Sequence, residues 1–339
     1  MNSIAGKQMH RCLPEHKPVV LDILNTEQQA IFDEVLANVR TSSPLLMFID
    51  GKAGRGKTFL VNSLCDYLRA HNQIVLATAT AAYAAQLYPG GRTTHSTFKV
   101  PVNEKSEMLD SPIQRNSPRA ELLKAATLII WDEAPMANKA VLSCVDDTLR
   151  RVMGNNIPFG GKILLLLGDF RQTCPVVRKG TRRQTVDASI RSCGLWDLFT
   201  VRRLTIPIRN AEDPAFAAFV DAIGDGAGPE IDLAALSLCS STNDVIDFVY
   251  PGTTIFDPIA AVRQSILAVT NEQTDHYNSV ILDRLPGPPR TYLAADSLKE
   301  ANDAGMIPPE PVLDYIAHSS TPPEGTTSTT NVTFPEILL

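Results

Sequence analysis

The sequence reads Gly51-Lys52-Ala53-Gly54-Arg55-Gly56-Lys57-Thr58 directly after an apolar run at residues 45–49 and Asp50. This octapeptide fits the phosphate-loop pattern G-x-x-x-x-G-K-[ST], and the apolar run supplies the strand that must precede such a loop. The glycines let the backbone curl so that several N–H groups point at one spot. Residues 59–69 are expected to form a helix, whose N-terminus adds a dipole and unpaired donors aimed at the same anion. A glycine-rich turn with a solvated lysine is the alternative, but the flanking strand and helix favour a nucleotide-binding site.

The loop assigns roles to its residues. All eight, from Gly51 to Thr58, are candidate nucleotide contacts. Lys57 is expected to lie between the β- and γ-phosphates, and the Thr58 hydroxyl is expected to hold Mg²⁺. Asn138-Lys139 is followed by Ala140 and does not complete an Asn-Lys-x-Asp element, which disfavours a guanine-specific GTPase.

Length and composition are those of an ordinary globular protein. The 339 residues exceed what one core usually organises, so two domains are expected. Hydrophobic residues make up 44% and the net charge is −6, which argues against a strongly basic nucleic-acid binder overall but allows a local basic groove. The six cysteines form no C-x-x-C pair, so neither a zinc site nor a redox motif is indicated. The sequence shows no secretory signal and no membrane-length apolar run, so an intracellular protein is expected.

Short apolar runs alternate with helical patterns along the chain. A first helix is expected after a cap at Asn25 or Thr26. Runs that are apolar on both faces suit buried parallel strands, and their alternation with helices implies an α/β sheet. We expect strands at 45–49, 74–79, 128–131, 163–167 and 265–269. Ligands bind beyond the carboxyl ends of such strands, where the sequence places Asp50-Gly51, Asp132-Glu133 and Gly168-Asp169.

Two carboxylates end the apolar run at 128–131. Asp132 is expected to hold Mg²⁺, directly or through water, and Glu133 to activate the attacking water as general base. An acidic turn that caps the next helix is the alternative, and the upstream phosphate loop makes it the weaker one. Gln172, shortly after the run at 163–167, is a candidate to hydrogen-bond the γ-phosphate or the attacking water.

These elements, in this order, resemble the petite-integration-frequency DNA helicases of superfamily one B, and most of all the helicase-like proteins encoded by rolling-circle Helitron transposons. The likeness covers about residues 24–300. It includes segments similar to the family's adenine-reading glutamine motif (24–28), Walker A loop (51–58), a segment near the single strand (89–98), acidic box (132–136), third motif (167–177) and fourth motif (204–209), with further stretches at 247–251, 267–271 and 292–297.

The resemblance implies a P-loop NTPase of the α/β class, with a RecA-like parallel sheet covered by helices on both faces and followed by a partial second RecA-like domain. We expect a flexible leader (1–23), a RecA-like ATP-binding domain (24–200), a partial second RecA-like domain (201–300) and a mostly disordered tail (301–339). The resemblance also implies ATP and Mg²⁺ as ligands, with Gln28 on the adenine and Arg209 reaching the γ-phosphate from the second domain. His95 and Phe98 are the candidate DNA contacts, although core burial is the favoured interpretation of Phe98 taken alone.

Several residues depart from the family's pattern. Lys52 and Arg55 add positive charge beside the phosphates, at positions where the family often has Pro and usually has Thr, respectively. A Ser-Gly pair is replaced by Ala81-Ala82, and Pro207 interrupts the fourth motif and removes a backbone donor. The family's late Gly-Gln and Ser-Arg steps have no counterpart in this sequence, so much of the second motor domain is expected to be absent.

Three functions are therefore open. The first is an ATP-dependent DNA helicase, a monomer that acts on single-stranded DNA and duplex junctions in the nucleus or mitochondrion, with roles in DNA repair and recombination. The second is a truncated remnant that binds ATP or DNA but does not cycle. The third is a P-loop ATPase switch of another class, which the acidic box and Arg209 disfavour. No membrane partner is expected.

Overall fold

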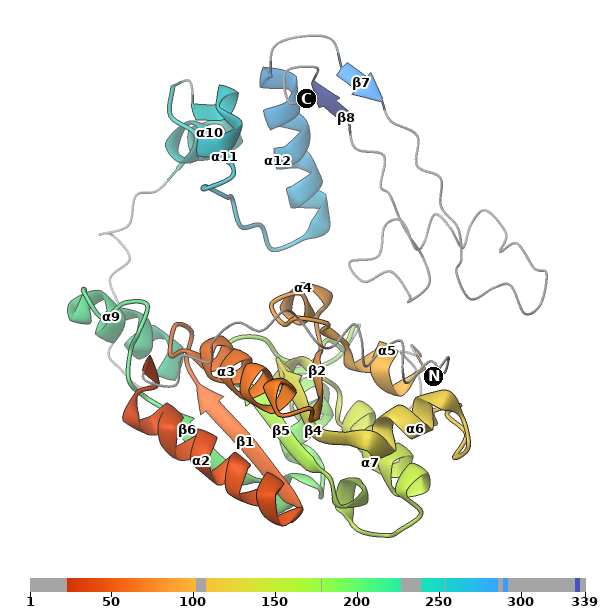
Figure 1. Cartoon of the computed structure of the whole chain (residues 1–339). Coiled ribbons are helices and arrows are strands. Elements are labelled where there is room, and N and C mark those ends of the chain that lie inside the picture. The colour runs from red at the N-terminus through yellow and green to blue at the C-terminus, as the bar shows by residue number, and fades with distance from the viewer. Residues whose placement is uncertain are drawn as a thin grey trace, which may run out of the picture. The chain divides into compact units, whose positions relative to one another are not determined.

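The computed structural model of the chain (Figure 1) describes residues 23–101, 108–177, 179–226, 239–252, 254–285, 289–291 and 333–335. Its contacts divide the chain into two compact units, Met1–Pro229 and Glu230–Leu339. The expected leader before Ile23, the expected tail apart from residues 333–335, and the helicase-like stretch at 292–297 lie outside the described residues. Among the described helices, none combines the length and the apolar character needed to cross a bilayer.

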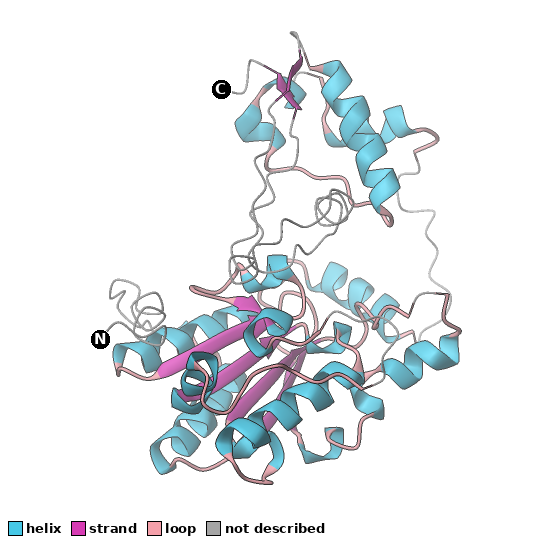
Figure 2. Cartoon of the chain, turned by 90° about the vertical axis from the view of Figure 1, so that its right-hand side faces the viewer, coloured by secondary structure: helices cyan, strands magenta, loops and turns pink. Residues whose placement is uncertain are grey.

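The first unit is built on one six-stranded sheet whose paired strands all run parallel (Figure 2). The strands lie in the order β3 (Arg92–Thr93), β2 (Ile74–Ala79), β4 (Ala126–Asp132), β5 (Ile163–Gly168), β1 (Leu45–Gly51) and β6 (Thr200–Leu204). The first four expected strands are the four central ones, which confirms the α/β class. The sequence pattern does not predict the two edge strands, because β3 is very short and β6 is mostly polar and exposed, with Leu204 as its one buried residue.

Alternate residues of the central strands enter two separate cores, one on each face of the sheet. On one face, Met47 and Ile49 of β1 pack with α2 (Thr26–Thr41) and α3 (Lys57–Ala70). On the other face, Phe48 of β1 and Trp131 of β4 pack with α6 (Pro118–Ala125) and α7 (Lys139–Met153). Helices therefore cover both faces, as the sequence predicts for strands that are apolar on both sides (Figure 1).

The first helix begins where its capping pattern predicts. Asn25 is the N-cap of α2, and its side chain accepts a hydrogen bond from the Gln28 N–H while the Gln28 side chain accepts one from the Asn25 N–H. The predicted apolar face of α2 is buried at Ile31, Phe32, Val35 and Leu36. This reciprocal cap fixes Gln28 at the start of the helix, beside the phosphate loop.

Shorter elements complete the first unit. Its remaining helices are α4 (Ala82–Ala85), α5 (Thr94–Phe98), α8 (Arg182–Ala188) and α9 (Pro214–Asp225). Its 3-10 turns are η2 (Ala134–Met136), η3 (Pro158–Gly161), η4 (Ile190–Ser192) and η5 (Trp196–Leu198).

The domain boundary differs from the expected one. The expected boundary follows residue 200, whereas the two compact units divide between Pro229 and Glu230. The reason is β6, which pairs with β1 from Met47↔Thr200 to Gly51↔Leu204 and so belongs to the first sheet. The helix that follows, α9, also lies in the first unit.

The described residues of the second unit are mainly helical. They form α10 (Thr242–Val249), η7 (Thr254–Phe256), α11 (Pro258–Ala261) and α12 (Asn271–Arg284), with an antiparallel pair of β7 (Pro289–Thr291) and β8 (Thr333–Pro335). The expected strand at 265–269 is wrong, because this segment has no strand structure and leaves Leu267 94% and Val269 95% exposed. A second RecA-like parallel sheet stays a prediction.

Candidate active site

The carboxyl ends of three neighbouring strands bring the predicted site residues to one edge of the first sheet. Asp50 of β1 lies opposite Gly168 of β5, and Trp131 of β4 lies opposite Leu166 of β5. The phosphate loop, Asp132 and Asp169 therefore all follow strand ends at the same edge. One strand, β5, separates the loop-bearing strand from the strand that carries Asp132.

The phosphate loop is packed so tightly that Gly56 admits no side chain. Gly56 has φ +80°, and a Cβ there would lie 2.5 Å from Gln28 Nε2 and 2.6 Å from Ile208 Cδ1. Gln28 is buried and donates from Nε2 to the Gly56 carbonyl over 3.2 Å. Helix α3 begins at Lys57, directly after this glycine, so the N–H groups of its first turn face the loop.

Lys57 lies among carboxylates. Its Nζ donates to the carbonyls of Gly51 (2.6 Å) and Lys52 (3.3 Å). Burial lowers the pKa of Lys57, and the nearby carboxylates of Asp132, Glu133, Asp169 and Asp50 partly offset that effect. The lysine is thus held at the loop by main-chain acceptors and by negative charge from three strand ends.

Asp132 and Glu133 differ in environment although they are neighbours. Asp132 is 4% exposed; its Oδ1 accepts from the Glu133 N–H (2.9 Å) and its Oδ2 from the Tyr88 hydroxyl (2.5 Å). Glu133 is half-buried and has φ +51° as the residue before η2. Burial, together with the charge of Asp132, raises the pKa of Glu133. A carboxylate with a raised pKa is better suited to accept a proton than one that is fully solvated.

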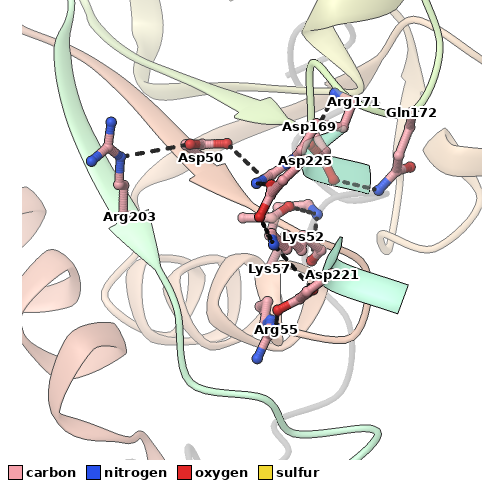
Figure 3. Close-up of polar contacts among 11 residues, drawn as sticks. Asp50, Lys52, Arg55, Lys57, Asp169, Arg171, Gln172, Arg203, Asp221 and Asp225 are labelled. Carbon is pink, nitrogen blue, oxygen red and sulfur yellow. Dashed lines mark hydrogen bonds and ion pairs between the residues drawn. The ribbon is translucent and has the colours of Figure 1, made fainter. Parts of the chain in front are cut away.

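Asp169 holds the side chains that follow β5. It is buried, its Oδ1 accepts from Arg171 Nε (2.6 Å), and its Oδ2 accepts from Gln172 Nε2 (3.3 Å). Figure 3 shows Gln172 and Arg171 on either side of this carboxylate. Gln172, a candidate from the sequence, therefore lies at the carboxyl edge and is held there by buried Asp169. Asp169 itself has no role predicted from the sequence.

Two aspartates of α9 pair with the unusual cations of the loop. Lys52 Nζ lies 2.9 Å from Asp225 and 3.2 Å from Asp221, and Arg55 lies 2.6 Å from Asp221. Asp225 also lies 3.3 Å from Arg171 (Figure 3). Asp221 and Asp225 are absent from the sequence-based set of site residues. The signal for them is indirect: two additional cations in a tight loop need counter-charges, and the four-residue spacing puts two aspartates on one helix face.

Arg209 contacts the loop from within the first unit. The N–H groups of Ile208 and Arg209 both donate to the Gly54 carbonyl over 3.0 Å. A cavity of about 190 Å³ lies beside this contact, and Gly54, Gln172, Arg209 and Asp221 are among its lining residues. The resemblance implies that Arg209 arrives from the second domain; the structure instead places it in the same unit as the phosphate loop.

The two candidate DNA contacts on α5 differ. Phe98 is 0% exposed in the core, so its ring is not available to a base, and the favoured interpretation of burial is confirmed. His95 is half-buried, and burial lowers its pKa, which keeps the ring neutral near pH 7. Tyr83 of α4 is an exposed aromatic near this edge, at 65% exposure, and its pKa is raised by partial burial and by the charges of Glu133 and Asp132.

Comparison with known proteins gives one consistent family. The model of the PIF1-like helicase family matches residues 23–232. The chain is 27% identical over 299 residues to the ATP-dependent DNA helicase PIF1 of Candida albicans, covering 84% of this chain and 32% of that protein. It is 30% identical over 270 residues to the ATP-dependent DNA helicase PIF1 of Trypanosoma brucei brucei, covering 78% of this chain and 24% of that protein. The chain thus spans about a quarter to a third of the length of these relatives.

Solved structures show the same fold. The crystal structure of Pif1 helicase from Candida albicans matches with a TM-score of 0.65 and 21% identity, over 92% of this chain and 63% of that one. The Bacteroides Pif1 helicase in complex with ADP-AlF3 and single-stranded DNA matches with a TM-score of 0.58 and 21% identity, over 90% and 63%. At this identity the likeness establishes the RecA-like fold of the parallel sheet.

Proposed function

Because the chain belongs to the PIF1-like helicase family, we propose that it binds ATP with Mg²⁺ at the carboxyl edge of its sheet and hydrolyses it to drive movement along single-stranded DNA. The observation that carries the proposal is the convergence of Lys57, at the end of the phosphate loop, with Asp132 and Glu133, at the end of β4, on one edge of the sheet. Family membership already implies nucleotide use. The metal, the residue roles and the DNA substrate are the proposed part.

The residues around the loop divide the chemistry of hydrolysis. Main-chain N–H groups of the loop and the first turn of α3 bind the phosphates, and Lys57 turns from its carbonyl acceptors to the β- and γ-phosphate oxygens. Glu133 accepts the proton of the attacking water, since its carboxylate is half-buried and shifted toward proton uptake. Gln172, held by Asp169, hydrogen-bonds that water or the γ-phosphate, and Arg209 neutralises the charge that develops there.

The donor set fits a magnesium ion. Asp132 accepts a hydrogen bond from the Tyr88 hydroxyl, and the Thr58 side chain lies within interaction range of the same hydroxyl, so a hydroxyl and a carboxylate oxygen lie close together. Among the described residues no group of three or more His, Cys, Asp or Glu side chains could hold a metal. Mg²⁺ commonly takes only one or two protein oxygens together with substrate phosphates and water. Thr58 and Asp132 would hold it, and when bound it neutralises charge on the β- and γ-phosphates.

Gln28 is proposed to face the adenine. It lies at the start of α2 and contacts the loop through the Gly56 carbonyl. Its cap to Asn25 occupies Oε1 and orients the side chain, and Nε2 has a second hydrogen to offer to an acceptor.

The DNA is proposed to cross the carboxyl edge near α4 and α5. One structural neighbour is titled as Bacteroides Pif1 bound to single-stranded DNA, and another as two coordinating Pif1 helicases at forked double-stranded DNA. On this chain Tyr83 of α4 offers an exposed ring for stacking, and His95 of α5 offers a neutral, half-buried ring. Single-stranded DNA and junctions as partners, the monomeric state, the nuclear or mitochondrial location, the roles in repair and recombination, and the Helitron likeness stay predictions.

The test is phosphate release by this chain with and without single-stranded DNA. We expect hydrolysis that DNA stimulates and that Glu133→Gln removes. The non-cycling remnant stays as the second candidate. Tight ATP binding without turnover, with or without DNA, would identify that second function. A chain that binds neither nucleotide nor DNA would rule out both.

A further inference from the structure

One buried side chain outside every assigned motif contacts both proposed metal ligands. Tyr88 is 2% exposed, and its hydroxyl donates to Asp132 Oδ2 over 2.5 Å. Burial and the charge of Asp132 raise the pKa of this hydroxyl, and hydrogen bonding with the Thr58 side chain opposes that rise. Tyr88 thus stands between the last residue of the phosphate loop and the carboxylate at the end of β4.

This arrangement orients each ligand for a cation. A hydroxyl has one proton and two lone pairs, so Thr58 can donate to Tyr88 and still offer its oxygen to another partner. Asp132 receives one donor on each oxygen, from the Glu133 N–H and from Tyr88. Each carboxylate oxygen has two acceptor sites, so both retain one. The carboxylate is therefore fixed in rotation without being saturated.

The position of Tyr88 is itself fixed from two directions. Its ring belongs to the core between α2, α3 and the sheet. Its carbonyl accepts from the Gly91 N–H over 2.9 Å, and a Cβ on Gly91 would lie 2.1 Å from the Ala85 carbonyl oxygen. The turn after Tyr88 therefore has one tight geometry. It leads into β3 and α5, where the Thr94 hydroxyl donates to Thr78 Oγ1 (3.1 Å) of β2.

We propose that Tyr88 is a positioning residue for the metal site: its hydroxyl sets the placement of Thr58 and Asp132 relative to each other and ties this pair to the turn that carries the α5 segment. The inference rests on the proposed nucleotide site. In this role Tyr88 hydrogen-bonds to the metal ligands without touching the metal. Loss of such a residue typically lowers metal affinity by about 10- to 100-fold. A tyrosine with only a packing role would not affect metal affinity separately from folding.

The experiment compares Tyr88→Phe with the matched control Tyr67→Phe. Both changes delete one hydroxyl from a ring that packs on the same core. Mn²⁺ binding in the presence of ADP is titrated by electron paramagnetic resonance, ADP binding is titrated in EDTA, and thermal melting follows folding. For Tyr88→Phe we expect Mn²⁺ binding weakened by about 10- to 100-fold with unchanged ADP binding in EDTA. Tyr67→Phe should leave both unchanged.

A double variant, Tyr88→Phe with Asp132→Asn, separates positioning from packing. If Tyr88 acts through Asp132, adding Tyr88→Phe to Asp132→Asn should weaken Mn²⁺ binding little beyond the loss that Asp132→Asn causes alone. Fully additive losses, wild-type Mn²⁺ affinity in Tyr88→Phe, or equal weakening of ADP binding in EDTA would each overturn the inference. A wild-type chain that binds no ADP would instead overturn the proposed function, and the inference with it.

Discussion

Two lysines with lowered pKa values, Lys57 and Lys162, lie at opposite ends of the same sheet, and they differ in the charges around them. Lys57 at the carboxyl edge donates to the carbonyls of Gly51 and Lys52. Lys162, directly before β5 at the amino edge, donates to the carbonyls of Lys124 and Ala126 over 2.6 and 2.8 Å. Lys57 has four carboxylates around it. For Lys162 burial is the cause of the shift, and it lowers the pKa to about 8.

The difference shows that burial and main-chain contacts alone do not mark a functional lysine. Both ends of a parallel sheet offer backbone acceptors, so a long side chain can fold onto them at either end. Only the carboxyl edge combines the lysine with a glycine loop, a helix N-terminus and acidic strand ends. These additions make one lysine a candidate for phosphate binding and the other a structural bridge between α6, β4 and β5.

Replacing the two lysines gives the largest expected contrast. Lys57→Ala leaves four carboxylates facing the loop without their cation. The variant also loses the cation that would meet the phosphates. Truncating one partner of a buried charge pair costs about 2–5 kcal/mol of binding free energy, so ATP affinity should fall by roughly 1,000-fold. Lys162→Met should leave ATP affinity within about threefold of the wild type. Equilibrium titration with a fluorescent ATP analogue measures both, and equal losses would break the comparison.

Glu133→Gln tests the acidic side of the carboxyl edge. The amide keeps the size of the side chain but cannot accept a proton, so phosphate release should fall by about 100-fold or more, while Mg-ATP binding persists. The measurement is single-turnover hydrolysis beside a binding titration. Wild-type turnover in this variant would show that another group is the base.

Lys162 predicts a pH effect on stability with a defined sign. Its pKa of about 8 in the folded protein lies below the ordinary value of 10.5. Between these two values the unfolded chain binds more protons, so the free energy of unfolding rises as the pH increases from about 8 to about 10.5. In Lys162→Met that rise should shrink by up to about 3 kcal/mol. Denaturant melts at pH 8 and pH 10 check the slope, and an unchanged slope in the variant would contradict the assignment.

The smallest expected effect concerns the α9 aspartates. Asp221→Asn with Asp225→Asn releases Lys52 and Arg55 from their ion pairs, and the freed cations can then meet the phosphates. Ion pairs this exposed hold their partners only weakly, so ATP should bind only about two- to fivefold more tightly. Asp187→Asn, which breaks the pair with Lys139 on another surface, is the control. Weaker ATP binding in the double variant would mean that α9 supports the loop.

The sequence predicts the centre of the first unit well, because local pattern and tertiary environment agree there. The runs around Phe48, Ile130 and Leu165 are apolar on both faces, and each is covered by helices on both sides. The run at 265–269 is also largely apolar, but no strand among the described residues pairs with it. An apolar run alone therefore does not decide between a buried strand and an exposed segment.

The residues of the candidate site also divide into those that the sequence predicts and those that it does not. Lys57, Asp132, Glu133 and Gln172 are predicted from their place after strands, and the structure brings them to one edge. Tyr88, Asp169, Asp221 and Asp225 are not assigned by motif, because their relevance depends on contacts between segments far apart in the chain. Phe98 shows the opposite case, where a motif position holds a core residue.

The hydrogen bonds from the Ile208 and Arg209 N–H groups to the Gly54 carbonyl have a consequence for mutagenesis. Because both partners are main-chain atoms, this tether between the phosphate loop and the segment leading into α9 survives most side-chain replacements, and alanine scanning would score it as silent. An amide-to-ester substitution at position 208 or 209, or a proline there, removes a donor and exposes the link. Sequence drift at these positions can therefore proceed without breaking this main-chain link between the two segments.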